Sequence, residues 1–244
     1  MRKITITLFA LLIATITGCH KNPVEPVEYK PIIPLSVGNY WLYLEYDLNS
    51  DGSGGTPSQW KFGFIIQNPL VQTPAVLNST NYQMYRCGED LKPIDDTNYL
   101  LYGGSKLVYQ NENGFYYSGI IRKDTVTMAF SDLIFPYPTE RGRSVSGHVF
   151  YYNNSGNSSN VPDEATTQYT CVSTDSLFTT PLGDFRCIVY KMVWQDLEPL
   201  FRDEVYYFIK PGLGIVGMVT MVLHYSTNQY AYISKILLTD YKIK

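Results

Sequence analysis

The chain has 244 residues and a formal net charge of −3, from 19 Lys and Arg against 22 Asp and Glu. Removing residues 1–18, which include Arg2 and Lys3, leaves 17 basic residues against 22 acidic ones, a net charge of −5. Such a chain offers no basic patch for the phosphates of a nucleic acid, so we expect no nucleic-acid partner. A hydrophobic content of 45% is enough for one sizeable core.

The first nineteen residues have the pattern of an export signal. Arg2 and Lys3 precede an apolar run, residues 4–16, that is too short to span a bilayer as a helix. Residues 16–19 (ITGC) then supply an aliphatic residue, two small residues and a cysteine. The segment resembles the lipobox of bacterial lipoprotein signals, which implies that residues 1–18 are removed and that Cys19 carries the lipid. The alternative is an ordinary export signal with an incidental cysteine.

Residues 19–35 read as a lipidated cysteine followed by a tether, because four prolines stand among charged residues there. Membrane contact would come from the lipid on Cys19 (acyl chains such as palmitate) and not from a polybasic surface. His20, rather than an aspartate, follows Cys19, and no acidic cluster comes after it. By resemblance to the sorting rule of enterobacterial lipoproteins, this favours the outer membrane and a domain facing the periplasm.

Residues 36–244 consist of short β-prone runs with period-two alternation, separated by turn residues. No segment there has the apolar spacing of a long amphipathic helix. We predict an all-β domain made of a single curved antiparallel sheet, in the form of a half-barrel, a barrel or a sandwich. The expected strands cover residues 40–45, 60–67, 81–87, 99–102, 106–110, 115–121, 125–130, 145–152, 167–178, 184–194, 204–209, 215–225 and 230–241.

Glycine-containing turns predict three hairpins. Gly103 and Gly104 would form one turn, and Asn113 with Gly114 a second, because these residues tolerate positive φ. A third tight turn falls near residues 181–183, with Gly183 at a position of positive φ.

The four cysteines are expected to leave free thiols. Cys19 is taken by the lipid, so Cys87, Cys171 and Cys187 can form at most one disulfide. If the turn near residues 181–183 is tight, Cys171 pairs near residue 192 and Cys187 near residue 176. These two are then about five residues out of register, too far apart to bridge.

Residues with catalytic chemistry form no recognisable set. His148 and His224 lie in strand-like runs and are interpreted as satisfied or half-exposed strand histidines. Acidic doublets, such as Asp203 with Glu204, are interpreted as solvated charge, because neighbouring strand residues point to opposite faces. The chain has no CxxC, HExxH or GxSxG motif, so we expect no metal and no cofactor. The residues favour a non-enzymatic protein, and the alternative is an enzyme without a known motif.

Three short patterns carry a family resemblance: residues 34–41 (PLSVGNYW), residues 180–187 (TPLGDFRC) and residues 206–216 (YYFIKPGLGIV). Together they resemble uncharacterised bacterial lipoproteins of the Bacteroidetes type. The resemblance implies a curved antiparallel β protein, loosely like periplasmic lipoprotein carriers, and it implies no functional residue.

The sequence leaves two function classes open. One is a non-enzymatic envelope lipoprotein whose sheet holds an apolar ligand in its concavity or scaffolds an assembly. The other is a carbohydrate-binding or carbohydrate-processing lipoprotein, in which Trp41, Trp60 or Trp194 would stack on sugar faces. The 22 tyrosines suit either an aromatic ligand surface or simply many strands.

Overall fold

A computed structural model describes residues 30–67, 80–87, 105–122, 125–151, 163–194, 201–224 and 229–244. These residues form twelve strands and no helix, which confirms the all-β prediction; none of them therefore belongs to a helix able to cross a bilayer. The signal, most of the tether and the expected Gly103–Gly104 hairpin lie outside these ranges. The strands are β1 (Tyr40–Asp47), β2 (Thr56–Gln67), β3 (Thr80–Cys87), β4 (Ser105–Asn111), β5 (Gly114–Arg122), β6 (Thr125–Pro136), β7 (Ser144–Tyr151), β8 (Asp163–Thr180), β9 (Gly183–Trp194), β10 (Phe201–Lys210), β11 (Gly214–His224) and β12 (Gln229–Lys242).

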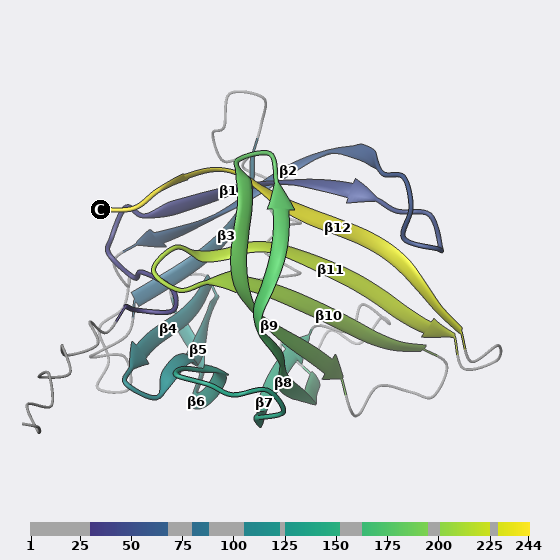
Figure 1. The fold of residues 1–244 in the computed structure, drawn as a ribbon. Helices are drawn as coiled ribbons and strands as arrows, with labels where there is room; N and C mark the ends of the chain where they lie inside the picture. Colours follow the sequence, from purple (N-terminus) through teal and green to yellow (C-terminus); the bar gives the residue numbers. More distant parts are fainter. Residues whose placement is uncertain are drawn as a thin grey trace, which may run out of the picture.

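All twelve strands belong to one curved antiparallel sheet with the order β6-β5-β4-β3-β2-β1-β12-β11-β10-β9-β8-β7 (Figure 1). Strands that follow one another in the chain are neighbours in the sheet, with the single exception of β6 and β7. The first and last strands, β1 and β12, pair in the middle of the sheet, with Tyr40 opposite Lys242. Strands β6 and β7 are the two ends of this hydrogen-bonded order and form no main-chain ladder with each other, so the sheet is not closed into a barrel.

The long hairpin of β8 and β9 bends across β10, β11 and β12 (Figure 1). Register shifts between Cys171 and Ser176 interrupt the β8–β9 ladder and permit this bend. Beyond it, the Phe178 ring stacks on Phe208 at 3.9 Å, and Gly217 leaves room for it because a Cβ there would collide with the ring. The hairpin tip thus covers the outer face of the sheet, the face that bears Phe208.

The chain joins the core at Ile32 and Ile33, which are 0% and 1% exposed. The expected tether, residues 19–35, therefore overlaps the folded domain by a few residues, because this apolar pair stands among prolines that suggested an extended linker. Asn39, also buried, donates from Nδ2 to the Pro34 carbonyl and accepts at Oδ1 from the Lys244 amide. One side chain therefore ties the first folded segment to the C-terminus.

Two predicted turns can be compared with the structure. Gly183 has φ +118° and follows a two-residue turn in which Thr180 pairs with Gly183, as expected. The turn between β4 and β5 is formed by Glu112 and Asn113, so its placement at Asn113–Gly114 was wrong by one residue. Gly114 instead opens β5, where a Cβ would collide with the Phe135 carbonyl of β6.

Candidate functional site

Aromatic side chains of β5 and β6 meet those of β8, β9 and β10 on one face of the sheet, which we name the inner face. The Phe135 ring of β6 lies 6.0 Å from Phe115 of β5 and 5.8 Å from Tyr169 of β8, measured between ring centroids. It also lies 5.1 Å from Tyr190 and 5.3 Å from Tyr207, on β9 and β10. We name these rings, with Tyr117 packed 5.9 Å from Phe115, the inner aromatic cluster: Phe115, Tyr117, Phe135, Tyr169, Tyr190 and Tyr207.

The cluster has a closed part and a more open part. Phe115, Phe135, Tyr169 and Tyr190 are at most 2% exposed and belong to the core. Tyr117 and Tyr207 are only half-buried against that core. Trp194 is half-buried too, and it shares the inner face, because its register partner Thr167 lies two residues from Tyr169 on β8. Among the rings named here, these three keep part of their surface exposed.

The hydroxyl groups of three cluster tyrosines share one environment. Burial raises the pKa of Tyr207, and the nearby Tyr117 raises it further. Burial also raises the pKa of Tyr169 well above its usual value, with further contributions from Tyr207, Tyr117 and the Asp132 carboxylate. These phenols therefore stay neutral at ordinary pH, and the inner face presents apolar rings with uncharged polar tips.

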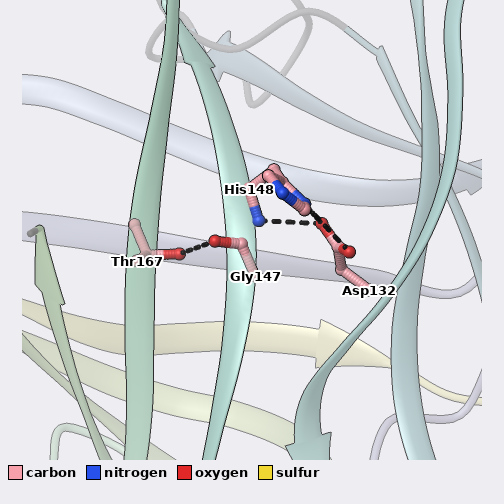
Figure 2. Close-up of polar contacts among 4 residues, drawn as sticks. All are labelled: Asp132, Gly147, His148 and Thr167. Atoms are coloured by element: carbon pink, nitrogen blue, oxygen red, sulfur yellow. Dashed lines mark hydrogen bonds and ion pairs between the residues drawn. The ribbon is translucent and has the colours of Figure 1, made fainter. Parts of the chain in front are cut away.

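Asp132 of β6 reaches from the border of the cluster to His148 of β7 (Figure 2). Its Oδ2 accepts a hydrogen bond from the His148 backbone amide at 2.8 Å and lies 3.0 Å from the Nδ1 atom of the ring. The Asp132 side chain is 11% exposed and that of His148 46%. This confirms the interpretation of His148 as a half-exposed strand histidine, whereas no sequence signal pointed to its acidic partner. The side chain of His224 lies outside the described residues.

Glu204 forms a second polar group on the outer face. Its side chain is 4% exposed and accepts hydrogen bonds from the Tyr206 hydroxyl at 2.9 Å and from Lys191 Nζ at 3.4 Å. The expectation that this acid would be solvated was therefore wrong: Glu204 is buried and bound by the Lys191 and Tyr206 side chains. A buried carboxylate paired with a lysine is typical of a structural ion pair.

Of the three tryptophans proposed for ligand stacking, the structure describes the side chains of Trp41 and Trp194. Trp41 is 1% exposed, and its indole Nε1 donates to the Leu213 carbonyl at 2.6 Å, so in this position it offers no face to a sugar. Gly214 lies against that indole, and a Cβ on residue 214 would come within 3.3 Å of the Trp41 Nε1 atom. This close approach explains why the second glycine of residues 206–216 is a glycine. Trp194 lies on the inner face, and the side chain of Trp60 is outside the described residues.

Cys171 and Cys187 are free and buried, as predicted. Cys187 pairs with Ser176 as expected, whereas Cys171 pairs with Tyr190, two residues from the expected position, because of the register shifts in β8. Burial raises the pKa of the Cys187 thiol to about 11. Such a thiol is a poor nucleophile at neutral pH. Within the described ranges, no three His, Cys, Asp or Glu side chains come together as metal ligands.

Comparisons with known proteins give distant similarities of structure only. No protein-family model matches the chain, and no curated protein shows significant sequence similarity to it. A protein of Bacteroides fragilis, assigned as exported and with a YmcC-like fold, matches with a TM-score of 0.44 and 13% identity, over 88% of this chain and 100% of that one. A protein of Parabacteroides distasonis, assigned as a lipoprotein, matches with a TM-score of 0.43 and 14% identity, over 87% and 99%. Similarities this distant carry no argument about function.

Proposed function

We propose that this chain is a lipid-anchored, non-enzymatic protein of the bacterial cell envelope that binds an apolar ligand on the inner face of its sheet. The anchor is inferred from residues 16–19 (ITGC), with Cys19 as the lipidated residue and the outer membrane, on its periplasmic side, as the location. The observation that supports ligand binding is the half-buried trio of Tyr117, Trp194 and Tyr207 beside a fully buried aromatic wall.

Rings in this arrangement suit an apolar ligand for a physical reason. Each partly exposed ring loses contact with water when a ligand covers it, at about 25 cal/mol per Å² of apolar surface. The ring hydroxyls are neutral, so covering them displaces no charge from water. The core rings behind them are packed on each other, so the wall does not have to be ordered when the ligand binds.

Ligand binding is tested with the full-length lipoprotein extracted in mild detergent. Native mass spectrometry would detect a co-purified lipid, and fluorescence titration with N-phenyl-1-naphthylamine would report apolar binding. We expect Tyr207→Ala to weaken probe binding about tenfold, the factor that corresponds to about 1.4 kcal/mol and to one aromatic contact. The matched control is Tyr116→Ala, because Tyr116 lies between Phe115 and Tyr117 on β5 but stacks on Tyr109, on the other face.

The outcomes separate the alternatives. Equal loss of binding in both variants would show that the probe does not use the inner face. A wild-type protein with neither bound lipid nor saturable probe binding would contradict ligand binding. If such a protein co-purified with a stable protein partner, the scaffolding role would be favoured instead.

A further inference from the structure

The junction of β6 and β7 differs from every other junction between neighbouring strands. All the other neighbours in the sheet are joined by main-chain ladders, whereas β6 and β7 lie side by side as the two ends of the strand order. We name this junction the seam. Opening a seam of this kind breaks side-chain contacts and leaves the main-chain hydrogen bonds of the sheet intact.

One end of the seam is firmly tied. The Tyr190 hydroxyl of β9 donates to the Pro136 carbonyl, where β6 ends. The connection that follows is bound to β8, because the Gly142 amide donates to the Cys171 carbonyl at 2.7 Å and the Cys171 amide donates to the Arg143 carbonyl at 2.9 Å. This end can therefore act as a hinge.

Asp132 lies further along the seam and acts as a latch. Its carboxylate binds both the backbone amide and the ring of His148, so one side chain takes the place of a ladder hydrogen bond (Figure 2). A charge-assisted hydrogen bond contributes more than a neutral one but far less than a whole ladder.

The seam borders the inner aromatic cluster directly. A Cβ built on Gly147 of β7 would lie 3.4 Å from the Tyr169 ring and 3.6 Å from the Asp132 Cβ. The Thr167 hydroxyl donates to the Gly147 carbonyl at 3.1 Å, which holds this stretch of β7 on β8. Separation at the seam would therefore move β6 away from β7 and expose the cluster next to Tyr169.

We propose that the seam is the entrance through which the apolar ligand reaches the inner face, and that the Asp132 carboxylate controls its opening. The inference rests on the proposed ligand-binding function and adds the route. Transient opening at the seam exposes the cluster, the ligand enters beside Gly147, and the bonds from Asp132 to His148 close the seam again.

An engineered disulfide across the seam tests the route. The separation of 3.6 Å between the two Cβ positions suits the pair Asp132→Cys and Gly147→Cys, since disulfides join Cβ atoms about 3.5–4.5 Å apart. Cys87→Ser is included in the background, and the buried Cys171 and Cys187 are retained. One protein then gives a locked seam when oxidised and an unlatched seam when reduced.

Stopped-flow binding of N-phenyl-1-naphthylamine would measure the exchange rates. We expect oxidation to slow probe association and release at least about tenfold, a change of about 1.4 kcal/mol in the barrier. Reduction of the same sample should restore fast exchange. Equal rates in the two redox states would overturn the proposal, while loss of probe binding by the wild type would overturn the proposed function and this inference together.

Substitutions of Asp132 give an independent test. Asp132→Ala removes both bonds to His148 and should speed probe release, whereas Asp132→Asn keeps an acceptor for the backbone amide and should have a smaller effect. Arg186→Ala is the control, because it breaks the bond of another carboxylate, that of Asp175 with Arg186 at 2.7 Å, on the β8–β9 hairpin away from the seam. Equal release rates for Asp132→Ala and the control would contradict a latch at Asp132.

Discussion

Individual buried tyrosine hydroxyl groups determine how the stability of the domain depends on pH. In five of the described tyrosines, burial raises the pKa far above its usual value: Tyr43, Tyr117, Tyr169, Tyr190 and Tyr207. The sequence showed that tyrosine is abundant, but it did not show which tyrosine hydroxyl groups are buried. For the four in the inner aromatic cluster, burial depends on contacts between β5 or β6 and β8, β9 or β10, which join residues far apart in the chain.

Alkaline pH should therefore unfold the domain cooperatively. The native state keeps these five protons while the unfolded chain releases them near pH 10, so stability is full below pH 10 and falls as pH rises above it. At pH 11 each such group lowers the free energy of unfolding by about 1.4 kcal/mol, and the five together lower it by about 7 kcal/mol. This is a large share of the stability of an ordinary domain. Circular dichroism and tyrosinate absorbance, followed together, should change at the same pH.

Tyr207→Phe is the control for this prediction. It removes one titrating group, whose hydroxyl contacts the Met192 sulfur at 3.8 Å, and should make the loss of stability with pH less steep by one proton. Gradual appearance of tyrosinate in a protein that stays folded would contradict the burial of these hydroxyl groups.

At the scale of elements, alternation and turn residues predicted most of the sheet. The twelve expected strands that fall within the described residues all match strands of the structure, because each depends on its own residues and an adjacent turn. The thirteenth, residues 99–102, lies outside the described residues. The seam, the bend of β8 and β9, and the buried pair at Ile32 and Ile33 were not predicted. Each of these depends on contacts with distant strands, and Asp132 in particular has no local feature that marks it as a bridge to His148.

Gly183→Val should destabilise the hairpin of β8 and β9. A Cβ at residue 183 meets nothing within 4 Å, so the only cost is the strain of a β-branched residue at φ +118°. We expect a loss of about 1–3 kcal/mol in the free energy of unfolding, measured by urea denaturation.

Leu182→Val is the matched control for this turn. It also places a β-branched residue in the turn, at the exposed position just before Gly183, and should change stability by no more than about 0.5 kcal/mol. Similar stabilities for Gly183→Val and this control would show that the turn tolerates the strained backbone.

At the scale of the whole molecule, the anchor and the domain should be separable. Cys19→Ser should abolish membrane attachment, since lipidation needs a thiol at the cleavage site. The described core begins at Ile32, so the variant should still fold. Fractionation after high-salt and carbonate washes, with circular dichroism of the released protein, measures both effects. A variant that remained with membranes after carbonate would show that another segment is embedded.

The pairing of β1 with β12 also has a consequence for how the chain could be rearranged. Arranged as a ring, the strands have hydrogen bonds but no covalent link between β12 and β1, and a covalent link but no ladder between β6 and β7. The missing chain link and the missing ladder lie on opposite sides of this ring of strands, so every strand is still held by its neighbours. Because the Lys244 amide donates to Asn39, the first and last segments of the described domain are close together. A circular permutant of this domain, with those two segments joined and residues 137–143 cut, would have the sheet edges as its new termini, and its strands would follow one another in simple succession from edge to edge.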